Sequence, residues 1–455
     1  MSSENITVGE LEFPPRKVWL KTYGCQMNYH DSERILYHLL NLGFIQVEKS
    51  QDADLIIFNT CAIRDRANQK FYSGLGEVKA LKKLKPDLVI GICGCVSQTE
   101  GKEIVSKYKQ IDFAFGTDTI DNISEYLNEI YAGKQGRVDL SQDQSKVYSI
   151  QTLLAHDSPK AFVNIIKGCD NFCSYCIVPF ARGREKSRKI DEIYNDVLNL
   201  VNNRGIQEIM LLGQNVNSFG KENGETLAEL VIELDKIEGL KILRYTTGHP
   251  YNLTDRLIEL HGSSKTLSRH LHLPIQSGSN TVLERMNRKY TREHYLGLLA
   301  KLRKSRPDIV ISTDLIVGYP NETEEEFLDT MRLLDEGQFD FIYSYKFSPR
   351  KNTLAFKIKD QLKDEIKRKR LRILQLHQLE IQRNIREQLV GKKMMVLVEG
   401  KSYMKNVLKW GGRTNCNRLI HFIPKDKEAD YRWKWVNLEV ISATALSLQG
   451  KLLDF

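Results

Sequence analysis

Three cysteines stand close together in the middle of the chain, in the pattern C-x3-C-x2-C: Cys169, Cys173 and Cys176. Three thiolates on one tight loop can bind three irons of a [4Fe-4S] cluster, and the fourth iron is then open to a substrate or cofactor. A closed zinc site needs four ligands, and no further Cys or His lies within ten residues of this loop. A zinc ion bound by three cysteines and water remains the alternative.

Three more cysteines, Cys25, Cys61 and Cys95, are far apart in the sequence, but each lies just past the end of a predicted strand. Ligands of open parallel sheets gather at the carboxyl ends of the strands. These thiolates are therefore candidates for a second cluster, and the alternative is that they fill the core. Cys93 falls inside its strand and Cys416 stands alone, so neither is assigned to a site.

Composition limits the class of protein. The 455 residues are 41% hydrophobic and 27% charged, which excludes disorder and collagen-like architecture and suggests about three domains. Eight clustered cysteines are too few for a secreted disulfide scaffold of this length. No stretch reaches the roughly 18 to 20 apolar residues of a membrane helix, and the first residues lack an apolar signal core. We expect a soluble, cytoplasmic protein with no membrane segment.

Positive charge is concentrated at the C-terminal end. The chain carries a formal charge of +9, while residues 361–455 hold 20 Lys or Arg and 10 Asp or Glu, a net of +10. A localised excess of this kind favours contact with a polyanion, with nucleic acid as the first candidate. The alternative is a solvated basic helix face.

The elements that must position Cys25, Cys61 and Cys95 lie in a predicted domain over 15–132. Apolar runs begin at positions 18, 54, 87 and 113, and helical patterns separate them at 29–41, 64–84 and 98–108. This alternation predicts an open parallel α/β sheet with helices on both faces. The polar segment 133–150 lacks an apolar period and is interpreted as a linker.

A second α/β domain is predicted over 151–360. Six apolar strand candidates, most followed by a helical segment, are consistent with a partial (β/α)6 barrel, whose chemistry would lie at the strand carboxyl ends. The segments LLGQN, TTGHP, PIQSGS and IVGYP occur at those ends, and their small residues permit close approach to a ligand. Taken singly, each is also compatible with an ordinary turn.

The C-terminal end changes pattern twice. Residues 361–390 predict one long amphipathic connecting helix, and short β-rich pieces over 391–455 predict a small antiparallel β-barrel. Aromatic residues there are interleaved with Lys and Arg, which permits stacking on exposed nucleotides, or simply core packing. These aromatic residues are Tyr403, Trp410, Tyr431, Trp433 and Trp435.

With these motifs the chain resembles the radical S-adenosylmethionine methylthiotransferase family over nearly its whole length. YGCQMN, NTCAIRDRA and GCV resemble the three cysteine motifs of the family's N-terminal domain, and KGCDNFCSYCIVPFARGREKSR resembles its radical motif. Further matches are LLGQNVNSFG, HLPIQSGSNTVLERMNRKYTREHY and STDLIVGYPNETEEEF. One departure is SPRKNTLAF at 348–356, where members often have a Pro-Gly-Thr turn, which puts the shape of that loop in doubt.

The resemblance implies the fold and the cofactors. The central barrel would be a radical-SAM barrel and the C-terminal barrel a TRAM-like RNA-binding domain. Cys169, Cys173 and Cys176 would hold the radical-SAM [4Fe-4S] cluster. Cys25, Cys61 and Cys95 would hold an auxiliary, sulfur-donating [4Fe-4S] cluster, and each turnover would consume two S-adenosylmethionine molecules.

The resemblance also implies a substrate and partners. GQNVNS resembles the branch that acts on N6-isopentenyl-adenosine 37 in the tRNA anticodon loop and inserts a methylthio group at C2. A radical cofactor is needed because acid–base chemistry cannot replace an unactivated aromatic C–H. An electron donor such as flavodoxin or ferredoxin and a monomeric state are expected.

Residues beyond the cysteines are further candidates for cofactor binding. They lie at the ends of predicted strands or follow the radical loop: Gly213, Gln214, Asn215, Gln276, Ser277, Arg182 and Arg184. Arginines in such a loop can hold a carboxylate or phosphate, or be solvated. Three alternative functions stay open: a methylthiotransferase for threonylcarbamoyl-adenosine 37, an iron-sulfur RNA-binding protein without radical activity, and a zinc-dependent enzyme.

Overall fold

The structure of the protein is a computed structural model that describes residues 16–62, 65–143, 158–359, 361–404, 407–426 and 428–453. The chain divides into two compact units. The described part of the N-terminal unit is 16–62, 65–143 and 177–183, and the C-terminal unit contains the other described residues. Residues 15 and 151, at which two predicted domains begin, lie outside the described residues, and so do residues 144–150 of the predicted linker.

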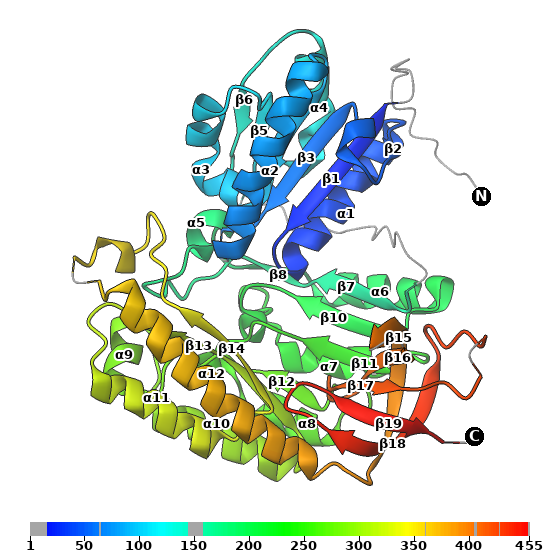
Figure 1. Ribbon diagram of the computed structural model, residues 1–455, viewed down its shortest axis with the longest axis vertical. Helices are drawn as coiled ribbons and strands as arrows, with labels where there is room; N and C mark the ends of the chain where they lie inside the picture. The colour runs from blue at the N-terminus through cyan, green and yellow to red at the C-terminus, as the bar shows by residue number, and fades with distance from the viewer. Residues whose placement is uncertain are drawn as a thin grey trace. The chain divides into compact units, whose positions relative to one another are not determined.

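The N-terminal unit is an open, wholly parallel sheet, as predicted (Figure 1). Within the described residues the strand order is β2-β1-β3-β4-β5-β6. The strands are β1 (Lys17–Tyr23), β2 (Ile45–Gln46), β3 (Leu55–Thr60), β4 (Val89–Cys93), β5 (Phe113–Phe115) and β6 (Arg137–Asp139). The helices are α1 (Gln26–Asn41), α2 (Asp65–Leu84), α3 (Gly94–Lys107), α4 (Ile123–Tyr131) and α5 (Val178–Arg182).

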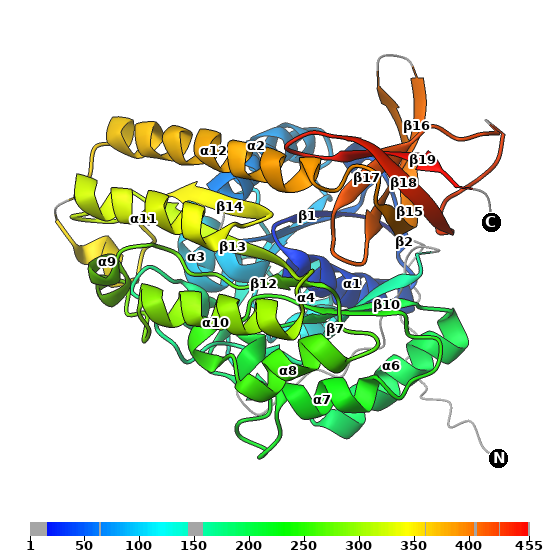
Figure 2. The ribbon, with the colours of Figure 1, turned by 90° about the horizontal axis from the view of Figure 1, so that it is seen from below.

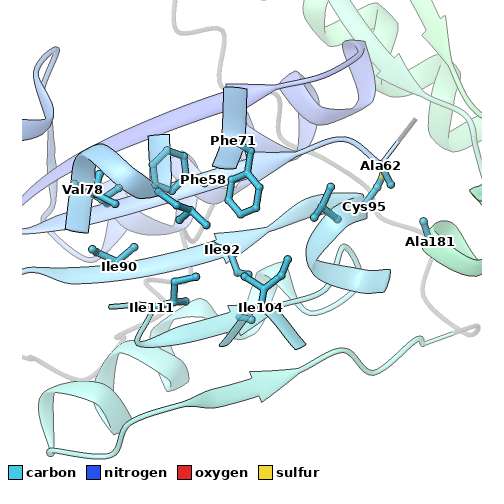
Figure 3. Packing of buried hydrophobic residues seen from close by; sticks show 14 of the residues in the cluster. Phe58, Ala62, Phe71, Val78, Ile90, Ile92, Cys95, Ile104, Ile111 and Ala181 are labelled. Carbon is cyan, nitrogen blue, oxygen red and sulfur yellow. The ribbon is translucent and has the colours of Figure 1, made fainter. Parts of the chain in front are cut away.

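Both faces of this sheet are covered, which explains the continuous apolar runs of β3 and β4. Residues of α2, α3 and α5 pack on one face in a core around Phe58, Phe71 and Ile92 (Figure 3). Residues of α1 and α4 pack on the other face. The sheet is thereby rigid up to its carboxyl edge, where the loops with cysteines begin.

The segment interpreted as a linker contributes a strand. Arg137–Asp139 forms β6, which pairs in parallel with β5 at the edge of the sheet. The linker interpretation is wrong for these residues. Short, polar edge strands carry no alternating apolar pattern, so periodicity does not reveal them.

Six parallel strands of the C-terminal unit follow one another in chain order, as a partial (β/α)6 barrel requires. Two three-stranded sheets, β11-β10-β7 and β12-β13-β14, are joined by a parallel bridge between Leu243 and Leu267. The strands are β7 (Lys160–Asn164), β10 (Glu208–Leu212), β11 (Ile242–Tyr245), β12 (His270–His272), β13 (Val310–Val317) and β14 (Phe341–Lys346). The short strands β8 (Ile166–Lys167) and β9 (Lys186–Ser187) pair beside them.

Helices connect these strands on the outside of the partial barrel. They are α6 (Ile190–Arg204), α7 (Leu227–Leu234), α8 (Asp255–Ser263), α9 (Asn280–Arg285), α10 (Arg292–Ser305), α11 (Glu324–Gly337) and α12 (Asp364–Glu387). The long helix α12 lies along α11 and β14, so it forms part of this layer as well as leading to the C-terminal barrel (Figure 2).

The C-terminal residues form a closed barrel of five strands in the order β15-β16-β17-β19-β18. All neighbouring strands are antiparallel except β17 and β19. The strands are β15 (Lys393–Met404), β16 (Val407–Thr414), β17 (Leu419–Phe422), β18 (Trp435–Ala443) and β19 (Leu448–Leu452). The β-barrel prediction is confirmed, although the sequence patterns missed β16 and β19, whose glycines and charges hide the alternation.

Buried polar contacts hold this small barrel against the rest of the C-terminal unit. Arg418 is paired with Asp340 at the start of β14. Arg244 donates to the carbonyl oxygens of Thr414 and Asn415 at 3.2 and 2.8 Å. The small barrel is therefore held at a defined position on the partial barrel. No helix in the described ranges is long and apolar enough to span a bilayer.

Candidate functional site

The cysteines Cys25, Cys61 and Cys95, called the auxiliary triad below, lie at one edge of the N-terminal sheet. Cys25 caps α1 after β1, Cys61 follows β3, and Cys95 is the second residue of α3 after β4. The three strands are neighbours, with Tyr23 opposite Thr60 and Asn59 opposite Cys93. Adjacent parallel strands in register thus bring together cysteines that are far apart in sequence.

Two glycines allow the loops of the triad to approach each other. Gly24, with φ of +155°, precedes Cys25, and a Cβ there would lie 2.7 Å from the Cβ of Cys61. Gly94, with φ of +89°, precedes Cys95, and a Cβ there would lie 2.5 Å from the carbonyl oxygen of Thr60. Both distances are shorter than real Cβ contacts, so the Gly-Cys pairs are a requirement of the close approach.

Buried amides fix the same loops. Asn28 Nδ2 donates to Asn59 Oδ1 at 3.0 Å, and Asn59 Nδ2 donates to the Asn28 carbonyl oxygen at 2.7 Å. The Asn28 Oδ1 atom accepts from the Cys25 backbone N–H at 3.4 Å. Satisfied buried amides specify one arrangement of their surroundings. Sequence reasoning missed both residues, although each lies within a cysteine motif.

Arg182 is also part of this site. It ends α5, which packs on α3 in the N-terminal unit, and its Nη2 donates to Asp31 Oδ2 at 2.6 Å. The two side chains are 5% and 3% exposed. Burial alone would lower the pKa of the Arg182 guanidinium, but Asp31 and the Cys95 thiol raise it well above its usual range. Sequence reasoning considered Arg182 only as a residue that follows the radical loop, and it missed Asp31.

The thiols of the auxiliary triad are electrostatically unequal. A hydrogen bond from the Cys61 thiol, helped by the charge of Arg182, lowers the pKa of Cys25 to about 6 against the effect of burial. Burial raises the pKa of Cys95, and Arg182 opposes that rise. Cys93, the last residue of β4, is fully buried, and its Sγ donates to the Gly116 carbonyl oxygen at 3.6 Å. Cys93 therefore belongs to the core, in agreement with its exclusion from the triad.

The cysteines Cys169, Cys173 and Cys176, called the radical triad below, lie on the loop after β8 in the C-terminal unit. The Cys176 backbone N–H donates to the Cys173 carbonyl oxygen at 2.9 Å, and the Ser174 N–H donates to the Met286 carbonyl oxygen at 3.0 Å. Asn171 Nδ2 donates to the Cys169 Sγ at 3.6 Å. Burial raises the pKa of Cys169 to about 11.

Arg288 is the cation nearest to the radical triad that sequence reasoning did not single out. Its Nη1 atom donates to the Cys173 Sγ at 3.3 Å, and its Nε atom donates to the Tyr290 hydroxyl at 2.8 Å. The guanidinium carbon lies 5.2 Å from the centre of the Tyr290 ring. Arg288 occurs in a motif quoted for the family resemblance, but only the fold brings it to Cys173.

The predicted residues after β10 lie next to the radical loop. Gln214 Oε1 accepts the backbone N–H of Gly168, and a Cβ on Gly213 would lie 2.3 Å from Ile166 Cγ2. The Asn215 amide is bound on all sides: Nδ2 donates to Glu185 and Asn252 at 3.1 Å each, and Oδ1 accepts the His249 N–H at 3.1 Å. Gln214 and Asn215 thus tie the radical loop to the ends of the second and third barrel strands.

The remaining predicted residues have different surroundings. Gln276 follows β12 with a positive φ of 82° and joins β13 through an isolated bridge to Leu315. Ser277 is fully buried, and its Oγ lies 3.4 Å from Thr330 Oγ1 on α11. Arg184 is exposed and forms a 2.8 Å ion pair with Asp170 in the radical loop. Ser277 therefore contributes to packing, while Arg184 fixes the loop.

The residues around the two triads are compatible with iron-sulfur clusters and with a bound polar cofactor. Within the described residues, the buried Gln214 Nε2 and His249 Nε2 atoms have no hydrogen-bond partner. Burial lowers the pKa of His249 to about 2, so its imidazole is neutral. In the same part of the chain no three His, Cys, Asp or Glu side chains converge as ligands of a single ion do. Cluster thiolates bind different irons, so they need not converge on one point.

The C-terminal barrel separates core aromatics from surface aromatics. Trp410 is buried in the barrel core, and Tyr431 packs against it. Trp435 Nε1 donates to Gln207 Oε1 at 2.6 Å. Tyr403 on β15 is 73% exposed, with the exposed Lys401 on the same strand. Of the five predicted aromatics, Tyr403 is the one with a widely exposed ring.

Comparisons with known proteins agree with this arrangement. Residues 17–116 match Uncharacterized protein family UPF0004, and residues 163–334 match the Radical SAM superfamily. The fold is similar to the solved structure of the radical S-adenosylmethionine methyltransferase TsrM from Kitasatospora setae with cobalamin and [4Fe-4S] cluster bound. That match has a TM-score of 0.54, covers 75% of this chain and 77% of that chain, and has 14% identity. The protein is thus a radical S-adenosylmethionine enzyme with an additional N-terminal α/β unit.

Relatives identify the family within this class. A protein from Acetivibrio thermocellus is 40% identical over 438 residues, which cover 95% of this chain and 90% of the relative. One from Staphylococcus haemolyticus is 42% identical over 446 residues, 97% and 85% of the two chains. One from Bdellovibrio bacteriovorus is 40% identical over 441 residues, 96% of each chain. All three are named tRNA-2-methylthio-N(6)-dimethylallyladenosine synthase, and this chain belongs to their methylthiotransferase family.

Proposed function

We propose that this chain is a tRNA methylthiotransferase. It inserts a methylthio group at C2 of N6-isopentenyl-adenosine 37 in tRNA and produces 2-methylthio-N6-isopentenyl-adenosine. The observation that carries the proposal is the presence of two cysteine triads, one at the carboxyl edge of a parallel sheet and one on the loop after β8, in a chain about 40% identical to synthases of that name over 95% of its length.

The radical triad and S-adenosylmethionine would provide the activation step. A [4Fe-4S] cluster with one iron free of protein ligands supplies reductive cleavage of S-adenosylmethionine, and hence a radical able to attack an unactivated aromatic C–H. Gln214 supports this role because its Oε1 holds the Gly168 N–H while its buried Nε2 remains a donor for a ligand. Gly213, Gln276 and Arg184 would shape and fix the surrounding loops.

The auxiliary triad would hold the second, sulfur-donating cluster. Cys25 is the thiol best prepared to bind iron, because its lowered pKa keeps it deprotonated near neutral pH. Arg182 supplies a buried positive charge beside the thiolates, and Asp31 holds that guanidinium in place. Asn28 and Asn59 keep the loops together.

The C-terminal barrel would bind the tRNA. Residues 391–455 carry 12 Lys or Arg and 6 Asp or Glu, and Tyr403 offers an exposed ring for stacking. Anticodon-loop bases are single-stranded and can be splayed out to reach an active site. Because the small barrel is bound to the partial barrel through Arg244 and Arg418, it would hold the RNA at a defined distance from the radical loop.

Three further properties belong to the proposal. The electron for reduction would come from a low-potential carrier such as flavodoxin or ferredoxin. The protein would act as a monomer, and it would act in the cytoplasm, where its tRNA substrate is found.

The test combines metal content with product analysis. Anaerobically purified protein is expected to contain about eight irons per chain, and a Cys169, Cys173, Cys176 triple alanine variant about four. The loaded wild-type protein, given S-adenosylmethionine, a reductant and tRNA with N6-isopentenyl-adenosine 37, should convert that nucleoside to its 2-methylthio form, as measured by mass spectrometry. Three outcomes would contradict the proposal. The protein could convert threonylcarbamoyl-adenosine instead, it could contain iron and convert neither nucleoside, or it could contain zinc and no iron.

A further inference from the structure

Arg288 is a buried cation with an unusual set of partners. It lies between α9 and α10, and it is 8% exposed. Its guanidinium donates to the Cys173 Sγ at 3.3 Å, to the hydroxyls of Tyr175 and Tyr290 at 3.4 and 2.8 Å, and to the Pro274 carbonyl oxygen at 2.8 Å. One of these four partners, the Cys173 thiol, is a cluster ligand in the proposed function.

Other buried arginines of the chain are paired with carboxylates. Arg182 pairs with Asp31, Arg244 with Glu208, and Arg370 with Glu322. Across the ranges that the structure describes, no Asp or Glu forms such an ion pair with Arg288. A buried charge without a counter-charge is costly, so proteins keep one where something anionic binds.

The position of Arg288 is enforced from two sides. Tyr290 accepts from Nε and donates its own hydroxyl proton to the Ile275 carbonyl oxygen at 3.0 Å. The Pro274 carbonyl oxygen accepts from Nη2, so the guanidinium plane is fixed while Nη1 faces Cys173. A lysine ammonium would keep the charge but could not make this set of fork-shaped contacts.

We propose that Arg288 is a positioning residue for the radical-SAM cluster, to which it supplies an N–H···S hydrogen bond on Cys173 and a buried counter-charge. This inference rests on the proposed function. One-electron reduction by a low-potential donor adds one negative charge to the cluster and breaks no bond. A cation at hydrogen-bond distance stabilises the reduced cluster more than the oxidised one, so Arg288 raises the reduction potential.

The test measures the potential of the radical cluster alone. In full-length protein whose Cys25, Cys61 and Cys95 are replaced by alanine, the midpoint is determined by dithionite titration followed by electron paramagnetic resonance. We expect R288Q to shift the midpoint to lower potential and R288K to shift it less. The control R256Q removes an exposed cation on α8 that pairs with Glu259, and it should leave the midpoint unchanged. An R288Q protein with full iron content and an unchanged midpoint would overturn the inference.

A second measurement tests the inference even if an Arg288 variant loses its iron and its midpoint cannot be determined. R288M removes the charge, and its resistance to urea is compared with that of wild type, both without iron and after cluster reconstitution. We expect R288M to be at least as stable as wild type without iron, because an uncompensated buried charge is removed, and less stable when loaded. An equal loss in both states would mean a merely structural role and would contradict the inference. Wild-type protein that binds no iron would instead refute the proposed function.

Discussion

Arg182 and Asp31 form a 2.6 Å ion pair in which both side chains are almost completely buried, beside the auxiliary triad. Arg182 lies six residues after Cys176 of the radical triad in the sequence, yet it belongs to the N-terminal unit. The pair leaves a cation held in place next to the thiols of Cys25 and Cys95. The segment after the radical triad therefore completes the site of the other triad.

The ion pair gives an expectation for stability. D31N leaves the Arg182 charge buried without its partner and should lower the free energy of unfolding of the iron-free protein by about 3 to 5 kcal/mol. The control E125Q breaks a surface pair with Arg137 and should cost less than about 1 kcal/mol. Urea denaturation followed by circular dichroism measures both. Equal losses in the two variants would show that the buried pair has no special role.

The lowered pKa of Cys25 makes its reactivity depend on pH. In iron-free protein we expect alkylation of Cys25 by iodoacetamide to reach half its maximal rate near pH 6, as mapped by mass spectrometry. C61A removes the hydrogen bond that contributes most to the shift, so the half-maximal pH should rise. A profile unaffected by C61A would contradict the assignment.

The same shift has a consequence for folding. Because the folded pKa of Cys25 is lower than the unfolded value of about 8.5, the unfolded chain binds more protons between these two pH values. The free energy of unfolding of the iron-free protein should therefore rise with pH across this window. The part of it that the Cys25 thiolate contributes should vanish as the pH falls through about 6. Urea midpoints of wild type and C25A at pH 6 and pH 8 isolate the effect, which C25A should lack.

Gln214 provides a test of cofactor binding. Q214L removes both amide functions and should weaken S-adenosylmethionine binding to loaded protein by about ten-fold, the cost of about one hydrogen bond to a buried group. Q214E keeps an acceptor for the Gly168 N–H but loses the Nε2 donor, so it separates loop positioning from ligand contact. Equilibrium dialysis measures the affinity, and N203A, on the exposed end of α6, serves as control. Wild-type affinity in Q214L would exclude the contact.

Tyr403 provides a test of RNA binding. Y403A should weaken binding of an anticodon stem-loop by about 1 to 3 kcal/mol, because one stacking platform is lost. I423A removes an exposed aliphatic side chain from the same barrel and should leave the affinity unchanged. Fluorescence anisotropy at two salt concentrations also measures the electrostatic share of the affinity, which should fall as salt rises. Equal affinities of Y403A and I423A would place the RNA elsewhere.

Local patterns predicted most of the fold. The parallel strands β3, β4 and β5 are mostly apolar runs because both faces of the sheet are buried there, and such runs are visible in the sequence. The strands that escaped prediction are short or interrupted by glycine and charge: β2, β6, β9, β16 and β19. Their stability comes from pairing with neighbouring strands, which periodicity within a strand does not report.

The two sets of cysteines could be recognised from the amino-acid sequence, because ligand spacing on a loop and position after a strand are local properties. The side chains that surround each set could not be recognised without the fold. Asn28, Asn59, Asp31 and Arg182 meet at the auxiliary triad, and Arg288 reaches Cys173, through contacts between residues far apart in the chain. A buried charge or amide is stabilised by the groups that it contacts. Strand order and helix packing, rather than neighbours in sequence, determine which groups these are.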